Sequence, residues 1–322
     1  MSSNSFDSII GNSRAAHAIR HFGARAAQVD APVLLLGESG TGKGVLARAI
    51  HQASARSARP FVGVNCAAVP DSLFESEFFG HVRGAFTGAQ FTHKGLFEQA
   101  HSGTLFLDEI GELPATAQAK LLTALEDRLI RRVGAEKTSP IDARIIAATT
   151  LDVYAASASG RFRVDLLHRL SVLTYTLPSL RVRNGDLRLL AEIFLADFST
   201  RHGRACSTLS DGAIAALYAH TWPGNIRELA NVIETSVLFC DDAVLEAQHL
   251  IIRAASAAHS QTIPRYGFAG AAADERQLIL QTLARCRGNK SQTAMELGMS
   301  RNTLHNKLRQ LDVSPVDSAI QS

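Results

Sequence analysis

The residues with the clearest chemistry form a glycine-rich segment, GESGTGK, at positions 37–43. This segment follows an apolar run at 33–36 and precedes a helical pattern, which is the setting of a P-loop. In such a loop backbone N–H groups turn inward around phosphate oxygens, where a Cβ would obstruct them. Lys43 would then reach the β- and γ-phosphates. The predicted nucleotide-binding residues are Gly37, Glu38, Ser39, Gly40, Thr41, Gly42, Lys43, Gly44 and Val45.

A pair of carboxylates follows about sixty residues later, at the end of the apolar segment GTLFLDE. Asp108 and Glu109 would lie at the carboxyl edge of a strand, where open α/β sheets bind ligands. We expect Asp108 to hold Mg²⁺ through water and Glu109 to orient and polarise the attacking water. Gly44 stands where most P-loops have a Ser or Thr hydroxyl on Mg²⁺, so the metal needs another ligand. Alternatively, the two acids simply begin a helix and favour its dipole.

The elements that must position these residues are short apolar runs separated by helix-period stretches, an α/β pattern. Strands buried on both faces of a parallel sheet have this nearly continuous apolar character. The candidate strands are 33–36, 61–65, 104–107, 144–149 and 172–177. From about Leu187 helical periodicity replaces the strand pattern and indicates a small helical lid. The predicted domains are an α/β ATPase core at 1–186, a lid at 187–253, a linker at 254–273 and an all-α domain at 274–322.

The amino-acid composition and net charge exclude several classes of protein. The 322 residues carry a formal net charge of only +3, which excludes a surface coated uniformly in positive charge. The four cysteines lie far apart with no C-x-x-C pair, which argues against a zinc cluster or a disulfide framework. The N-terminus has no secretory pattern, and no apolar run approaches the ~18 residues of a membrane span. We therefore expect a soluble, unexported, cytoplasmic protein with no membrane partner.

Positive charge is concentrated near the C-terminus. Residues 288–311 have the pattern of one helix, a tight turn at Gly298 and a second helix that begins at Ser300, which is helix-turn-helix spacing. The segment from Arg285 to Arg309 contains six Lys or Arg residues and one acidic residue, which gives it a net charge of +5. A basic solvated helical hairpin is the alternative. The predicted DNA-binding residues are Lys290, Ser300, Arg301, Asn302, Thr303, His305, Asn306, Lys307 and Arg309.

The region from about Asp7 to Arg253 contains a six-residue motif, GAFTGA. This motif distinguishes it from ordinary P-loop proteins. In this motif, in the glycine-rich segment 37–43 and in the carboxylate pair Asp108 and Glu109, the region resembles the AAA+ ATPase domain of bacterial enhancer-binding proteins. Those proteins activate sigma-54 RNA polymerase. The resemblance implies that the motif contacts sigma-54. The alternative is an ordinary turn whose phenylalanine packs into the core. The motif residues are Gly84, Ala85, Phe86, Thr87, Gly88 and Ala89.

The resemblance implies roles for residues outside these motifs. Asn65, in FVGVNC, matches an Asn that hydrogen-bonds the catalytic glutamate and links the nucleotide state to the loops. Thr149 matches the sensor I position, whereas Thr150 stands where the family usually has Asn. Gly44 occupies a position that is usually Glu in this family.

Three arginines complete the site that the resemblance implies. In GRFRVDLLHRL, Arg163 and Arg169 match the arginines that reach the γ-phosphate of a neighbouring subunit. In WPGNIREL, Arg227 matches the sensor II arginine that faces the nucleotide. The alternative is that Arg163 and Arg169 are ordinary arginines on the solvated face of a helix.

The function implied is an ATP-hydrolysing transcription activator that uses ATP and Mg²⁺. As a hexameric ring tethered to upstream enhancer DNA by a Fis-type helix-turn-helix, it would remodel the closed sigma-54 RNA polymerase complex. Because the match begins within the first ten residues, we also expect no receiver domain and control in trans by a regulatory protein or by synthesis. Two alternatives are an AAA+ unfoldase or protease motor, which has no use for GAFTGA, and a repressor that only binds nucleotide.

Overall fold

The computed structural model describes residues 5–183, 185–252, 283 and 293. The chain divides into two compact units, Met1–Ala255 and Ser256–Ser322, and the description below concerns the first. The predicted linker at 254–273 and all nine predicted DNA-binding residues, from Lys290 to Arg309, lie outside the described residues. Within the described part of the chain, no helix has both the length and the apolar character needed to cross a membrane.

Five parallel strands form the central sheet, as the apolar runs predict. They are β1 (Val33–Leu36), β2 (Phe61–Asn65), β3 (Thr104–Asp108), β6 (Arg144–Thr149) and β7 (Leu173–Thr176), in the order β2-β3-β6-β1-β7. Parallel register places the carboxyl ends of β1, β6 and β3 on one edge, where the P-loop follows Leu36 and Asp108 ends β3. The sheet therefore brings the two predicted nucleotide motifs to the same edge.

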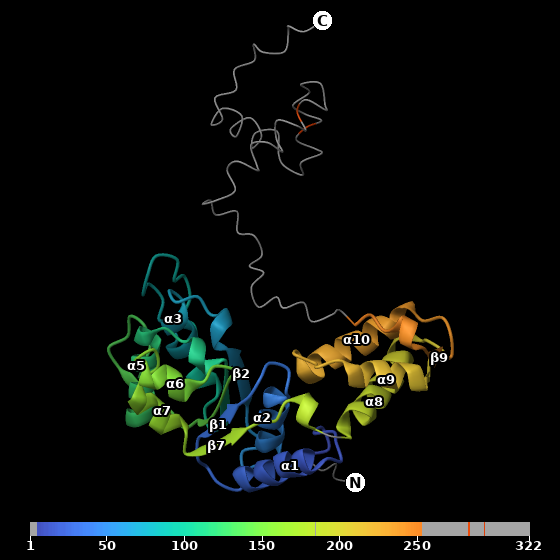
Figure 1. Cartoon of the computed structure of the whole chain (residues 1–322). Helices are drawn as coiled ribbons and strands as arrows, with labels where there is room; N and C mark the ends of the chain where they lie inside the picture. The colour runs from blue at the N-terminus through green and yellow to red at the C-terminus, as the bar shows by residue number, and fades with distance from the viewer. Residues whose placement is uncertain (1–4, 184, 253–282, 284–292, 294–322) are drawn as a thin grey trace, which may run out of the picture. The chain divides into compact units, whose positions relative to one another are not determined.

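Helices cover both faces of this sheet (Figure 1). Alternate strand residues point to opposite faces, so Leu105 and Leu107 of β3 join one apolar cluster and Phe106 joins the other. One face packs against α1 (Arg14–Ala27) and α2 (Lys43–Gln52). The other packs against the remaining helices of the core, which are α3 (Phe74–Phe79), α4 (Leu96–Gln99), α5 (Ala115–Asp127), α6 (Val153–Ala158) and α7 (Val164–Leu170).

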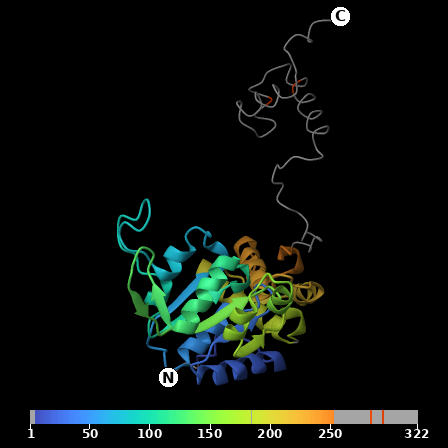
Figure 2. The same cartoon turned by 90° about the vertical axis from the view of Figure 1, so that its left-hand side faces the viewer.

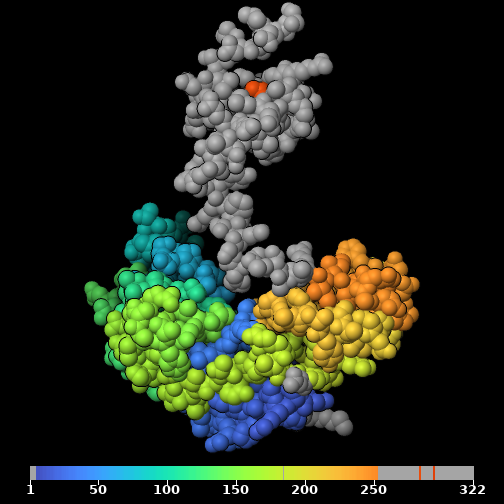
Figure 3. Space-filling model, viewed as in Figure 1, coloured from blue at the N-terminus to red at the C-terminus, as the bar shows by residue number. Residues whose placement is uncertain are grey.

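Helices α8 (Asp186–His202), α9 (Asp211–Ala219) and α10 (Asn225–Phe239) form a separate helical lid with its own apolar cluster. Trp222 is buried at its centre and donates its indole N–H to the carbonyl of Leu217 at 2.9 Å. The lid is drawn in yellow to orange beside the core in Figure 1 and, as a surface, in Figure 3. The helical lid that the sequence predicts is thus present.

Two small sheets were not apparent from the sequence. One is an antiparallel hairpin of β4 (Leu129–Arg131) and β5 (Thr138–Pro140), and the other is a parallel pair, β8 (Thr208–Leu209) with β9 (Val244–Leu245). Strands of two or three residues are too short to give an apolar period.

A buried ion pair attaches the N-terminal segment to the start of the lid. The Asp186 carboxylate accepts hydrogen bonds from the backbone N–H of Ser13 at 2.8 Å, from the Ser13 hydroxyl at 2.6 Å and from Arg183 Nε at 2.9 Å. Arg183 also donates to the carbonyl of Ile10. Burial raises the pKa of Asp186, but the hydrogen bonds from Ser13 and Arg183 outweigh it and hold that pKa below its usual value.

We expect Asp186→Asn to lower the free energy of unfolding by about 3–5 kcal/mol, because it leaves the Arg183 guanidinium buried without its counter-charge. Urea denaturation of the full chain at pH 7 measures the loss. The matched control is Glu192→Gln, which breaks the exposed pair with Arg188 and should cost less than about 0.5 kcal/mol. Because the folded pKa of Asp186 is depressed, its contribution is present above pH ~4 and is lost as the pH falls further. Equal losses for the two variants would contradict this assignment.

Candidate functional site

The P-loop connects β1 to α2 and leaves the first backbone N–H groups of that helix without side-chain caps. Gly37, Gly40 and Gly42 have φ values of 141°, 75° and 101°, a region that L side chains rarely adopt. A Cβ at Gly40 would also lie 2.1 Å from the carbonyl oxygen of Gly224. Helix α2 begins at Lys43, and its N-cap Gly42 offers no side-chain acceptor. Uncapped N–H groups at a helix N-terminus are a binding site for phosphate.

Lys43 is buried and its ammonium group lies inside the loop. Its Nζ donates to the carbonyls of Gly37 at 2.8 Å and Glu38 at 3.2 Å. Burial lowers the pKa of Lys43, and the nearby carboxylates of Glu109 and Asp108 oppose that shift. The loop therefore holds one cation at its centre and faces two acids from the adjacent strand end.

Asp108 and Glu109 lie at the carboxyl end of β3, as predicted. Burial, followed by repulsion from Glu109, raises the pKa of Asp108. Glu109 has a left-handed backbone with φ 52°, and its N–H donates to Asp108 Oδ1 at 3.1 Å. Its carboxylate Oε2 accepts from both the backbone N–H and the hydroxyl of Thr150, each at 3.0 Å. Thr150 is therefore the residue that orients Glu109 in this structure.

In this structure no hydrogen bond joins Asn65 to Glu109 among the described residues. Asn65 lies opposite Asp108 in the strand register, but its side-chain oxygen accepts from the N–H of Ala67 and caps the short helix at Cys66–Ala68. The Glu109 carboxylate is instead held by Thr150.

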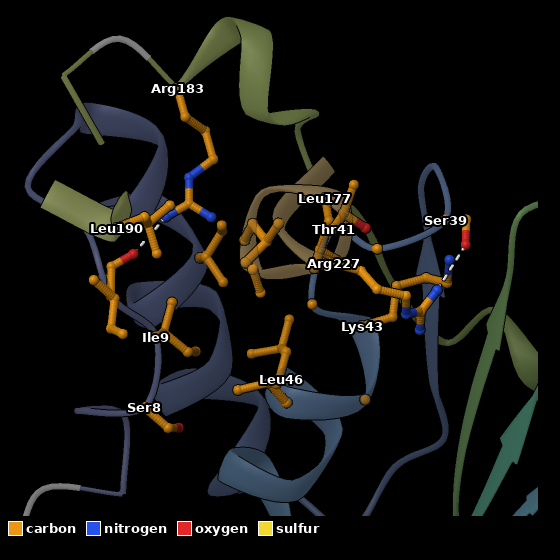
Figure 4. Close-up of a pocket in the computed structure, with 18 of the residues that line it drawn as sticks. Ser8, Ile9, Ser39, Thr41, Lys43, Leu46, Leu177, Arg183, Leu190 and Arg227 are labelled. Carbon is orange, nitrogen blue, oxygen red and sulfur yellow. Dashed lines mark hydrogen bonds between the residues drawn. The ribbon is translucent and has the colours of Figure 1, made fainter. Parts of the chain in front are cut away.

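A cavity of about 390 Å³ lies between the P-loop, the N-terminal segment and the lid. One end is polar, with Lys43, Asp108 and Glu109, and the other end is apolar. Arg227 reaches in from α10 and donates to the hydroxyl of Ser39 at 2.9 Å (Figure 4). The apolar lining includes Ile9, Ile10, Leu177, Leu190 and Phe194. This division suits a nucleotide, with its base at the apolar end and its phosphates at Lys43.

The remaining predicted nucleotide contacts differ in where their side chains point. Val45 and the backbone of Gly44 line the cavity, and the nearest atom to a Cβ built on Gly44 is Phe106 Cε1 at 3.8 Å. The Thr41 hydroxyl donates to the carbonyl of Glu38 at 2.8 Å. Thr149 is buried, its hydroxyl oxygen accepts from the N–H of Leu151, and it does not line the cavity.

Asn225, which the sequence analysis did not single out, joins the P-loop to the lid. It is fully buried with φ 52°, and its amide donates to Glu38 Oε2 at 3.1 Å and to the carbonyl of Ser39 at 2.9 Å. Its side-chain oxygen accepts from the N–H of Leu180 at 2.8 Å. Arg181 pairs with Glu38 and, through that hydrogen bond, lowers the pKa of Glu38. The signal in the sequence was an Asn immediately after Gly in WPGNIREL, because Asn tolerates a left-handed backbone.

Arg163 and Arg169 do not line the nucleotide cavity. Arg163 precedes α7, is exposed and pairs with Asp165 at 2.7 Å. Arg169 donates to the carbonyl of Leu125 at 2.9 Å and lines a second cavity with Arg128. Neither guanidinium therefore serves the site of its own chain in this structure.

The GAFTGA segment forms an exposed loop between α3 and α4, which projects from the core in Figure 2. Gly84 and Gly88 have φ values of 82° and 102°, and the N–H of Gly84 donates to the carbonyl of Ala89 at 2.8 Å. Phe86 is 43% exposed and Thr87 is exposed. The alternative in which Phe86 is a core residue is therefore wrong.

We expect Asn225→Gly to weaken ADP binding about 30-fold, because the P-loop loses two hydrogen bonds that hold its shape, each worth about 1 kcal/mol. Glycine keeps the left-handed backbone, so the variant isolates the side chain. Fluorescence titration with a labelled ADP measures the affinity. Arg181→Met is the control, since it removes only a half-exposed ion pair with Glu38 and should change affinity less than about 3-fold. Wild-type affinity in Asn225→Gly would refute the role of this side chain.

Comparison with known proteins matches three successive families. Residues 9–176 match the sigma-54 interaction domain, residues 181–264 the AAA+ ATPase lid domain and residues 272–311 the Fis family of bacterial regulatory proteins. The Escherichia coli regulatory protein AtoC is 44% identical over 96% of this chain and 68% of its own length. The hydrogenase transcriptional regulatory protein HoxA of Cupriavidus necator is also 44% identical, over 90% of this chain. The chain spans only 62% of HoxA.

A solved structure with the same fold carries the ligand that the cavity suits. NtrX from Brucella abortus in complex with ATP superposes with a TM-score of 0.69 at 34% identity, over 94% of this chain and 69% of the NtrX chain. The ADP complex gives the same values. The P-loop cavity, the lid and these matches together show that the chain belongs to the sigma-54-dependent AAA+ transcription activators, ATP-binding ATPases with a Fis-type helix-turn-helix domain.

Proposed function

We propose that this ATPase remodels the closed sigma-54 RNA polymerase complex by pressing the GAFTGA loop against sigma-54. The observation that carries the proposal is the exposed pair Phe86 and Thr87 at the tip of a loop bounded by two left-handed glycines. An apolar ring and a hydroxyl beyond the reach of the nucleotide cannot take part in phosphoryl transfer. Their exposure suits contact with another protein.

The loop has neighbours that can transmit movement. The Phe86 ring lies edge-on to His81 at 5.0 Å, and His81 pairs through its backbone with His93 at the base of the loop. The N–H of Val82 donates to the carbonyl of Val133, which lies in the loop of the β4–β5 hairpin. A displacement of either loop therefore moves the other.

For hydrolysis, we assign phosphate binding to Lys43 and the P-loop, with Arg227 from the lid. Asp108 and Glu109 are adjacent carboxylates, and burial together with repulsion from Glu109 raises the pKa of Asp108, so a bound cation would stabilise the ionised pair. Oxygen donors of this kind suit Mg²⁺, which Asp108 would hold through water. When bound, Mg²⁺ neutralises charge on the β- and γ-phosphates. Glu109, oriented by Thr150, would polarise the attacking water.

The proposal includes assembly into a ring, inferred to be a hexamer, in which Arg163 and Arg169 reach the nucleotide of a neighbour. Their separation from the cavity of their own chain supports this arrangement. The nine residues from Lys290 to Arg309 are assigned to enhancer DNA, because they lie in a helix-turn-helix pattern and the segment from Arg285 to Arg309 has a net charge of +5. Because its partners are RNA polymerase and DNA, we infer that the protein works in the cytoplasm. We also infer that it is controlled by a regulatory protein in trans or by its own synthesis.

We expect mixtures of Arg163→Ala and Glu109→Ala subunits to recover ATPase activity that neither variant has alone. Each variant supplies at a shared interface the group that the other lacks, and a trans arginine is worth roughly 10³-fold or more in rate. Steady-state phosphate release across a range of mixing ratios measures the recovery, with Arg188→Ala subunits as a surface-arginine control. A rate per subunit that is independent of protein concentration would contradict assembly-dependent hydrolysis.

We expect Thr87→Ala to hydrolyse ATP within a few-fold of wild type yet to lose transcription activation, because Thr87 lies outside the nucleotide cavity. Binding to sigma-54 in the presence of ADP and aluminium fluoride, and transcription in a reconstituted system, measure the loss. Phe86→Ala should behave in the same way, with little change in melting temperature.

The matched control for the loop is Phe239→Ala, which removes a phenylalanine of the lid that is 75% exposed. This control should keep both sigma-54 binding and activation. A Thr87→Ala protein that still activates sigma-54 transcription would overturn the proposal, whatever its ATPase rate.

A further inference from the structure

The loop that carries GAFTGA has a second exposed phenylalanine, which lies outside the motif. Phe91 follows Ala89 by two residues and is 78% exposed, more than any other large apolar side chain in the described part of the chain. Phe86, inside the motif, is 43% exposed and lies edge-on to His81. Phe91 makes no such ring contact with the described residues, so its aromatic surface is open to a partner.

Backbone hydrogen bonds keep Phe91 next to the motif. His81 and His93 exchange backbone hydrogen bonds at 3.1 and 2.9 Å, which joins the two arms of the loop at its base. The N–H of Arg83, in the first arm, donates to the hydroxyl of Thr92 at 3.3 Å. Phe91 therefore lies in the second arm of a closed loop that projects from the core (Figure 2).

The two phenylalanines are close enough to meet one partner. Five residues separate Phe86 from Phe91 along the chain, and five extended residues span at most about 18 Å. An ordinary protein interface covers about 800 Å² on each partner, which is wide enough to include both rings. A protein that contacts the tip of the loop at Phe86 and Thr87 can thus also contact Phe91.

The charge of the loop narrows the chemistry of that partner. Residues 81–95 contain Arg83 and Lys94 and no acidic residue, a net charge of +2 with the histidines neutral. Both of these cationic residues are exposed. An apolar ring with cationic neighbours is complementary to an apolar spot bordered by acidic groups.

We propose that Phe91 is a second apolar contact for sigma-54, beyond the GAFTGA motif, at a surface of sigma-54 with acidic groups around it. The inference rests on the proposed function of the loop. A single exposed phenylalanine is common in proteins, and Phe239 of the lid, 75% exposed, is such a case. Phe91 differs from Phe239 because its surface is continuous along the loop with Phe86 and Thr87.

The first test compares two substitutions of Phe91 in the full chain. Phe91→Ala should weaken binding to sigma-54 about 10-fold in the presence of ADP and aluminium fluoride, because the apolar contact is lost. Phe91→Leu keeps most of the apolar area and should stay within about 3-fold of wild type. Fluorescence anisotropy with labelled sigma-54 measures the affinity, and Phe239→Ala is the matched control that should bind as wild type does.

ATP hydrolysis and the melting temperature separate this contact from a structural role. Phe91 is exposed and lies outside the nucleotide cavity, so Phe91→Ala should hydrolyse ATP within about 2-fold of wild type and melt at the same temperature. A loss of assembly-dependent ATPase activity in Phe91→Ala would instead indicate a contact between subunits, and it would overturn the inference.

The second test identifies the partner directly. The photoreactive residue p-benzoylphenylalanine, placed at position 91, should crosslink to sigma-54 in the ADP–aluminium fluoride complex. Crosslinks only between copies of this chain would overturn the inference.

Thr87→Ala distinguishes a failure of this inference from a failure of the proposed function. If Thr87→Ala loses sigma-54 binding while Phe91→Ala keeps wild-type affinity, the role of Phe91 is wrong and the proposed function stands. If Thr87→Ala also keeps its sigma-54 binding and activation, the proposed function fails, and the role of Phe91 fails with it.

Discussion

The contact between the P-loop and the lid is the interaction on which the rest of the nucleotide site depends. A P-loop must keep its backbone N–H groups free for phosphate, so it cannot be held in shape by hydrogen bonds to those groups. Asn225 solves this problem because it binds the Ser39 carbonyl and the Glu38 carboxylate instead. The same side chain accepts from Leu180, at the start of the lid. One buried amide therefore contributes both to the shape of the loop and to its contact with the lid.

The polar side chains on the two strands beside β3 are held by different partners. Glu109 is held by Thr150, at the end of β6, while Asn65, at the end of β2, is engaged with its own following turn. Both partners belong to strands that flank β3. Thr150, and not Asn65, therefore fixes the Glu109 carboxylate in this structure.

Much of the fold follows from local patterns in the sequence. The five strand positions were predictable because both faces of a parallel sheet are buried, so each strand is a continuous apolar run. The P-loop and the GAFTGA loop were recognisable because glycines with positive φ cannot be replaced without strain. A motif gives the position of a side chain but not its partner, and in this structure Asn65 binds its own following turn and not Glu109. Thr150, the residue that departs from the family pattern, is the partner that the fold selected.

The sequence by itself determined which short segments form strands, helices and tight turns, because those choices depend on residues a few positions apart. Only the tertiary structure decided the pairings between distant segments, since they depend on how helices and strands pack. Ser13 reaches Asp186, and Glu38 reaches Asn225, only because the N-terminal segment and the P-loop both contact the lid.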